Sequence, residues 1–288
     1  MRKARTGRLP ARLPEPVPAP APATRSGRRH RADHPDDRLG KGRSAFGPAE
    51  LFAIARRVAQ RDPRALLGAP PAPTTLDEVI TAWRDVWGWD AAASAPARID
   101  VTRSRAAAVA AVARMDEVAR GGGRIAFATA APAALLGTHV TLAARARALG
   151  ASVVTDRVGG SFHDRGRRAL SVTWVAGVAT ATDGDDLVTS VGGEAAEEWR
   201  FRVPFVDLVV ADGAFAGRAM TDGCETVAFA DLDAVAFACC APRVNSHVVP
   251  VPTRAPAGDY EPFLAGVLEA LESIAASPAP LDNSESPS

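Results

Sequence analysis

The sequence predicts an α/β fold: a three-layer, Rossmann-like, mainly parallel sheet with an antiparallel hairpin insertion and an N-terminal helical cap. Two observations predict it. Short apolar runs at 206–211 and 226–230 are separated by a helical spacer, which is typical of strands buried on both faces of a parallel sheet. Helical and strand patterns also alternate along the chain, as they do in folds built from strands and crossover helices.

The N-terminal part of the folded region is predicted to be helical. Apolar residues recur at helical spacing over 48–60, 75–87 and about 102–120. A run of three glycines at 121–123 follows the third helix and precedes a strand at 124–128. A dinucleotide-binding fingerprint has its glycines after a strand and before a helix, so this run only ends a helix.

The strand at 124–128 is followed by a turn and a helix at about 133–149. Thr129 is a candidate N-cap, and the N–H groups near Ala130 and Ala131 lie where a helix N-terminus binds anions. These three residues are therefore candidate phosphate ligands. His139 lies about two turns into the helix and is a candidate catalytic residue, with a packed or surface role as the commoner alternative for a histidine there.

Alternating residues over 171–182 and 187–190 predict the antiparallel insertion, with a turn at Asp183-Gly184. Asp183 and the nearby aspartates resemble part of a calcium loop. The glutamate that completes such a loop is not at the required spacing, so turn formation is favoured. An acidic helix at 194–202, a last strand at 245–251 and a final helix at 263–275 complete the elements.

Both central apolar runs stop on an aspartate, Asp212 and Asp231. Ligands of open α/β sheets bind at the carboxyl ends of the strands, so these aspartates are candidate catalytic residues and candidate ligands of Mg²⁺ or Mn²⁺. Gly213, next to Asp212, joins the candidate phosphate ligands. Helix capping and turn formation are the alternative for either aspartate. Asp231-Leu-Asp233 matches the outline of an aspartyl-phosphatase motif, but it lies late in the fold and is interpreted as chance.

Composition divides the chain into three parts. Residues 1–46 are rich in Arg and Pro and are expected to be a disordered basic tail, residues 47–276 a single α/β domain, and residues 277–288 a second disordered tail. The net charge is +1, which argues against a field that attracts nucleic acid or acidic membranes. Nucleic acid is therefore an unlikely partner, except for the basic tail.

No apolar run is long enough to span a bilayer, so no membrane partner is expected. The three cysteines do not form a disulfide framework, and they indicate a reducing compartment. The expected location is the cytoplasm.

Several motifs, taken in order, resemble a family of actinobacterial proteins labelled "phosphatase", over about residues 48–273. The motifs are FATAAP, LLGTHVTLAARARALG, WVAGVATATDGDDL, PFVDLVVADGAFAG, ETVAFADLDAVAF, VVPVP and DYEPFLAGVLEAL. The resemblance favours the following positions as functional: Thr129, His139, Asp183, Asp212, Gly213, Gly217 and Asp231.

The chain departs from this family pattern at two places. It has Ala130-Ala131 where related sequences tend to have Gly-His, and Val188-Thr189-Ser190 where they often have a histidine. If those histidines carry chemistry in the family, this member is expected to be weakened or altered.

The function expected from the resemblance and the two aspartates is hydrolysis of a small phosphorylated metabolite, with assistance from a divalent metal. Two alternatives stay open. One is a non-catalytic module that binds a nucleotide or sugar phosphate, and the other is a lyase or cyclase that acts on a small acidic metabolite.

Overall fold

A computed structural model describes residues 46–91, 97–155, 160–164, 168–190, 192–203 and 205–276. The chain divides into two units, Met1–Ala32 and Asp33–Ser288, and all the described residues belong to the second. The tails predicted to be disordered lie outside the described residues, apart from Phe46. The ring of Phe46 packs under the Arg254 guanidinium, so this one residue of the predicted tail contacts the domain.

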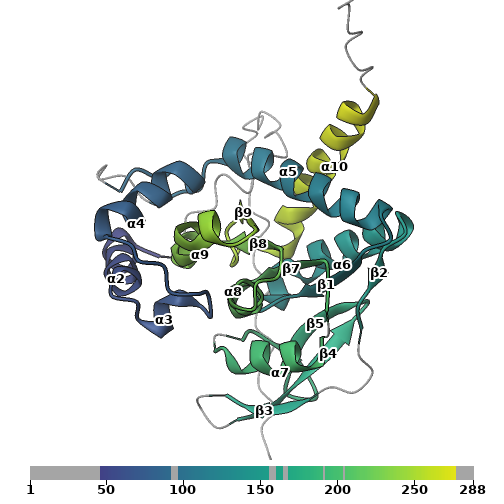
Figure 1. The fold of residues 1–288 in the computed structure, drawn as a ribbon, viewed down its shortest axis with the longest axis horizontal. Coiled ribbons are helices and arrows are strands. Elements are labelled where there is room, and N and C mark those ends of the chain that lie inside the picture. The colour runs from purple at the N-terminus through teal and green to yellow at the C-terminus, as the bar shows by residue number, and fades with distance from the viewer. Residues whose placement is uncertain are drawn as a thin grey trace, which may run out of the picture. The chain divides into compact units, whose positions relative to one another are not determined.

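A mixed sheet forms the centre of the fold, in the order β3-β4-β5-β1-β7-β8-β9, with β2 beside β1 and β6 beside β5 (Figure 1). The strands are β1 (Arg124–Ala128), β2 (Ser152–Val153), β3 (Ser161–His163), β4 (Ala169–Val175), β5 (Val178–Thr182), β6 (Leu187–Val188), β7 (Leu208–Asp212), β8 (Thr226–Ala230) and β9 (Ser246–Pro250). Strands β5, β1, β7, β8 and β9 run parallel, and β3, β4 and β6 pair antiparallel. The predicted fold class is confirmed.

Helices cover both faces of the sheet. They are α2 (Pro48–Ala59), α3 (Pro63–Leu66), α4 (Leu76–Ala82), α5 (Val101–Arg120), α6 (Pro132–Ala148), α7 (Glu194–Arg202), α8 (Gly213–Thr221), α9 (Val235–Cys240) and α10 (Tyr260–Ala276). Short helices η1 (Trp83–Trp87), η2 (Leu232–Ala234), η3 (Ala241–Arg243) and η4 (Ala257–Asp259) join them.

The alternation of side chains along each strand divides the core into two layers. Ile125 and Phe127 of β1 pack with α5, α6 and α10. Ala126 and Ala128 of the same strand pack with α7, α8, α9 and the first three helices. These short alanine side chains let helices approach the sheet closely, and the larger residues fill the opposite layer.

The N-terminal helices lie in two different layers. α5 belongs to the α6 and α10 layer, whereas α2, α3 and α4 gather beside α9 (Figure 1). α4 continues into the π-helix η1, whose indole groups tie this region to the end of β8. Trp83 Nε1 donates to the Leu232 carbonyl at 2.8 Å, and Trp87 Nε1 donates to the Ala230 carbonyl at 3.0 Å. The N-terminal helices thus fix the backbone on either side of Asp231.

The antiparallel insertion contains more strands than the sequence predicted. β4 and β5 form a hairpin that turns at Ala176-Gly177, and β3 adds to its outer edge. The predicted turn at Asp183 joins β5 to β6.

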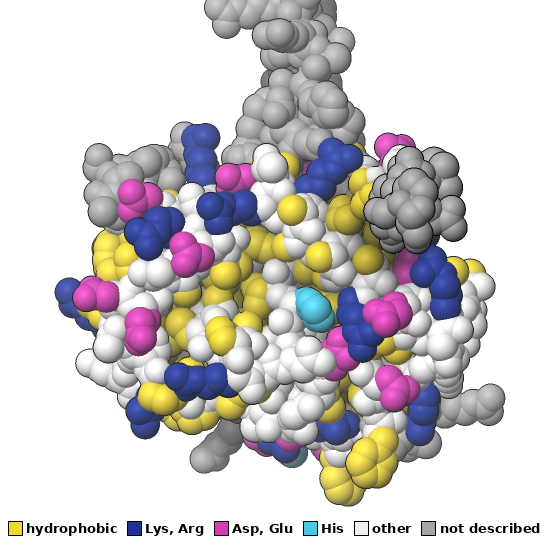
Figure 2. Space-filling view, turned by 45° about the horizontal axis from the view of Figure 1, so that its top comes forward, with side chains coloured by type: hydrophobic (Ala, Val, Ile, Leu, Met, Phe, Trp, Pro, Cys, Tyr) yellow, Lys and Arg dark blue, Asp and Glu magenta, His cyan; other side chains and the backbone are white. Residues whose placement is uncertain are grey.

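Acidic and basic side chains are interspersed over the face drawn in Figure 2, with apolar side chains between them. The described residues on that face form no large single-sign patch of the kind that binds a phosphate backbone. Within the described residues, no helix has both the length and the apolar character needed to cross a bilayer.

Candidate active site

The carboxyl ends of three neighbouring parallel strands meet at one edge of the sheet. Ala128 of β1 pairs with Ala211 of β7, and Asp212 pairs with Phe229 of β8. After β1 the chain forms β2, which pairs with one side of β1, and it later forms β7, which pairs with the other side. The order of the sheet reverses between β1 and β7, which is where open α/β sheets bind their ligands.

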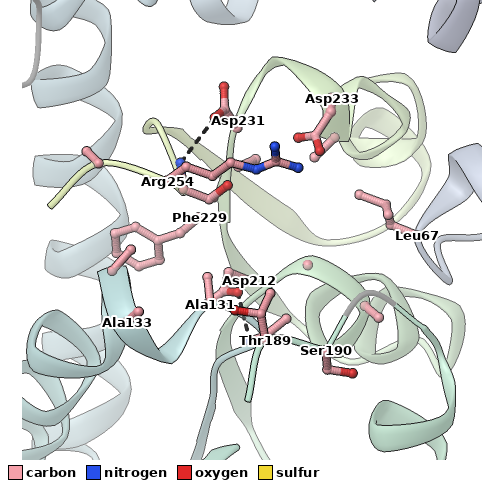
Figure 3. Close-up of a pocket in the computed structure, with 18 of the residues that line it drawn as sticks. Leu67, Ala131, Ala133, Thr189, Ser190, Asp212, Phe229, Asp231, Asp233 and Arg254 are labelled. Atoms are coloured by element: carbon pink, nitrogen blue, oxygen red, sulfur yellow. Dashed lines mark hydrogen bonds between the residues drawn. The ribbon is translucent and has the colours of Figure 1, made fainter. Parts of the chain in front are cut away.

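A cavity of about 560 Å³ opens at this edge (Figure 3). Its walls are mostly alanine and other apolar residues, with a few polar groups. The lining residues are Leu67, Ala130, Ala131, Ala133, Ala134, Thr189, Ser190, Asp212, Gly213, Ala214, Phe229, Ala230, Asp231, Asp233, Ala234, Thr253, Arg254, Ala255 and Pro256. A concave, largely apolar pocket with a few converging polar groups is typical of a small-molecule site.

Asp212 is buried and bonded into the fold on both sides. Its Oδ1 accepts a hydrogen bond from the Ala130 backbone N–H at 2.8 Å, and its Oδ2 lies 3.1 Å from His139 Nε2. His139 is itself fully buried, with its ring edge-to-face against Phe229, and it is not among the described lining residues. Asp212 therefore joins β7 to the turn after β1 and to α6.

The predicted phosphate cradle after Thr129 is largely occupied by the protein's own groups. The Ala130 N–H donates to Asp212, and the Ala131 N–H donates to Thr129 Oγ1 at 3.1 Å. The helix begins at Pro132, whose N-cap is Ala131, so Thr129 is not the N-cap that was predicted. A carboxylate already lies at the start of α6, where the sequence suggested a bound phosphate. The sequence could not reveal this, because Asp212 is 82 residues from Ala130.

The two glycines of α8 have different roles. Gly213 lines the pocket with φ of 52°, and a Cβ there would lie 2.8 Å from Ala130 Cβ. Gly217 lies one turn further, where a Cβ would be 2.0 Å from the Leu67 carbonyl oxygen. Gly213 thus permits the tight turn beside Asp212. Gly217 lets α8 pack against the backbone after α3, which brings Leu67 to the pocket wall.

Asp231 lies at the end of β8 and is bonded only to nearby backbone. Its Oδ1 accepts from the Leu232 N–H at 2.7 Å and its Oδ2 from the Thr253 N–H at 3.2 Å. Burial raises the pKa of this carboxyl to about 7, and the negative charge of Asp233 adds to the rise. Asp231 can therefore hold or release a proton near neutral pH.

Two charged pocket residues, Asp233 and Arg254, were not among the candidate site residues predicted from the sequence. Burial raises the pKa of Asp233, while the positive charge of Arg254 opposes that rise and also lowers the pKa of Asp231. Figure 3 shows the Arg254 side chain extending across the pocket towards Asp233. The Asp231-Leu-Asp233 match contained a signal for Asp233, whereas nothing in the local sequence distinguished Arg254.

The remaining predicted residue, Asp183, is exposed and is not among the described lining residues. Its carboxylate accepts from the N–H groups of Asp185 and Asp186, which close the turn between β5 and β6. These backbone hydrogen bonds lower its pKa. Its surroundings are those of a turn former.

Both departures from the family pattern fall on the pocket wall. Ala130 and Ala131 line one side, with Thr189 and Ser190 beside them. The Ser190 N–H donates to the Ala130 carbonyl at 3.0 Å, so the two segments are directly joined. Where the resemblance suggested histidines, this chain presents methyl and hydroxyl groups.

The predicted metal pair, Asp212 and Asp231, lies at the pocket with its carboxylates engaged by protein groups. Each oxygen of both carboxylates accepts a hydrogen bond or faces a histidine, and Figure 3 shows the Asp231 carboxyl directed away from Asp212. The described part of the chain also contains no group of three or more His, Cys, Asp or Glu side chains placed to hold a metal ion.

A comparison with known protein families gives one finding. A family model described as Phosphatase matches residues 49–275, a range that includes every residue lining the pocket. No curated protein and no solved structure matches the chain.

Proposed function

The chain belongs to the family described as Phosphatase, and from that premise we propose that the pocket hydrolyses the phosphate monoester of a small metabolite. The observation that carries the proposal is the position of Asp231. It is a buried carboxyl with a pKa of about 7, and it lines a cavity that also contains an arginine. A proton donor and a phosphate-binding cation are the two groups that this hydrolysis needs.

Arg254 is the proposed phosphate ligand. It is the only cationic side chain among the described lining residues, and its guanidinium carbon lies 4.6 Å from the centre of the Phe46 ring. A planar guanidinium can form two parallel hydrogen bonds with phosphate oxygens. The alanine-rich wall then surrounds the organic part of the substrate.

Asp231 is the proposed proton donor. A water oxygen forms a bond to phosphorus while the bond from phosphorus to the ester oxygen breaks. Protonated Asp231 gives its proton to the departing oxygen, and a proton lost by the attacking water restores it. The products are an alcohol and inorganic phosphate. A carboxyl that titrates near the working pH suits this transfer.

Asp212 and His139 are proposed as positioning residues. They hold the turn at Ala130 and the start of α6, which form the pocket wall opposite Asp231. The side chains of Asp212 and His139 are buried, whereas Asp233 is partly exposed and Arg254 is exposed at the cavity.

Mg²⁺ or Mn²⁺ enters the proposal only as an ion that arrives with the substrate phosphate. Mg²⁺ commonly binds through one or two carboxylates together with substrate phosphates and water. The proposed location is the cytoplasm, supported by the three cysteines, which are free thiols.

A second candidate is a module that binds a phosphorylated metabolite without turnover. It is favoured by one observation: the described pocket wall has alanines and hydroxyl residues, with no histidine. Histidine is the commonest proton-transfer residue in catalysis.

An assay of phosphate release from a panel of phosphorylated metabolites, with EDTA or with Mg²⁺ and Mn²⁺, tests the proposal. We expect kcat/KM to fall as pH rises through about 7, because Asp231 loses its proton there. Asp231→Asn should lower kcat about 100-fold or more, and it should also abolish the fall in kcat/KM as pH rises through about 7. Ligand binding without phosphate release in the wild-type protein would favour the binding module instead.

A further inference from the structure

The charges in the pocket do not suit a simple phosphate ester. Three lining carboxyls, Asp212, Asp231 and Asp233, share the cavity with one guanidinium, that of Arg254. Asp212 is withdrawn into its contacts with Ala130 and His139, and Asp231 carries its proton in the proposed reaction, which leaves the Asp233 carboxyl and the Arg254 guanidinium to meet a ligand. A phosphate dianion on Arg254 would add negative charge next to carboxyls that are already costly to ionise.

We propose that the ligand carries a cationic amine as well as a phosphate, with the phosphate on Arg254 and the ammonium group at Asp233. This inference rests on the proposed function, and it narrows the substrate to an amino-bearing phosphate ester, such as an amino-sugar phosphate. A ligand with both charges satisfies the guanidinium and the carboxylate together.

The placement of Asp233 supports its role as the amine acceptor. It follows β8 in η2, whereas Arg254 follows β9, so the two charges reach the cavity from adjacent strand ends. Both aspartates border the cavity, but Asp231 is buried whereas Asp233 is only partly buried. The cavity, at about 560 Å³, is within the range that accommodates a phosphorylated sugar.

The test uses pairs of esters that differ only in the amine. Glucosamine 6-phosphate is compared with glucose 6-phosphate, and phosphoethanolamine with 2-hydroxyethyl phosphate, by phosphate release and by the rise in melting temperature. Each is measured in EDTA and again with Mg²⁺, since a divalent ion could neutralise the same carboxyls. The full-length chain is used.

We expect the amino ester of at least one pair to be preferred about tenfold, in EDTA as well as in Mg²⁺, because a hydrogen bond to a charged group contributes about that much. Asp233→Asn should bring the ratio of the two esters close to one. The matched control is Asp77→Asn, an exposed aspartate on α4, which should leave the ratio unchanged.

The outcomes separate this inference from the proposed function. Equal turnover of both members of each pair, or a preference that Asp233→Asn does not change, overturns the amine inference and leaves hydrolysis standing. A preferential rise in melting temperature with the amino ester, without phosphate release, supports the ligand class and rejects hydrolysis. No response to any of the four esters overturns both.

Discussion

The two aspartates at the carboxyl edge of the sheet are used in opposite ways. Asp212, at the end of β7, is bonded to Ala130 and His139, which belong to the turn after β1 and to α6. Asp231, at the end of β8, is bonded to the backbone N–H groups of Leu232 and Thr253, and its pKa is raised to about 7. The same sequence signal, a buried strand that stops on aspartate, thus produces a residue that joins elements and a residue that can exchange a proton.

The largest effect that we expect on stability comes from removing the joining residue. Asp212→Ala leaves the Ala130 N–H and His139 without their buried partner. Removing one member of such a buried pair costs about 3–5 kcal/mol. The free energy of unfolding, measured by urea denaturation, should fall by that amount.

Asp212→Asn is the matched control, because an amide keeps one acceptor for the Ala130 N–H and offers a donor to His139. It should recover most of the lost stability. If Asp212→Ala unfolds at the same urea concentration as the wild-type protein, Asp212 does not join these elements and belongs with Asp231.

The second prediction concerns the proton of Asp231. An unfolded aspartate titrates near pH 3.9, whereas Asp231 in the fold titrates near 7. Between these values the folded state binds more protons than the unfolded state, so stability falls as pH rises, by up to about 1.4 kcal/mol for each pH unit. Above pH 7 this contribution is flat.

Asp231→Asn isolates that contribution, since other carboxyls titrate in both proteins. The difference in unfolding free energy between the wild-type protein and Asp231→Asn should decline from pH 4 to 7 and then level off. A difference that is independent of pH would mean that Asp231 stays ionised over this range.

The sequence predicted the strands well because their signals are local. The run at 226–230 is a strand with those bounds, and the strand at 124–128 also agrees. Both strands consist almost entirely of buried residues, so burial on both faces is visible in their composition. Placing Asp212 and Asp231 at one edge followed from the prediction of these strands.

The use of each aspartate could not be predicted in the same way. The partners of Asp212 are 82 and 73 residues away, and the Thr253 N–H that reaches Asp231 is 22 residues away. No local pattern specifies such contacts, and Arg254 has no signal of its own. The division of the N-terminal helices between two layers was not predicted for a related reason, because it depends on which sheet face each helix meets.

The smallest expected effect concerns the rim of the pocket on the Asp231 side. Phe46 packs against the Arg254 guanidinium, and a cation–π contact at an exposed site contributes about 0.5–1 kcal/mol. Phe46→Ala should therefore weaken binding of inorganic phosphate about two- to fivefold by calorimetry, while Phe46→Tyr keeps the aromatic face and the affinity.

Arg254 also lowers the pKa of Asp231, so a less restrained guanidinium should move the fall in kcat/KM to a slightly higher pH. Asp212 is bonded to Ala130 and His139, so its contribution to stability should be unaffected. Equal phosphate affinity in the wild-type protein and Phe46→Ala would show that Arg254 is positioned without the ring.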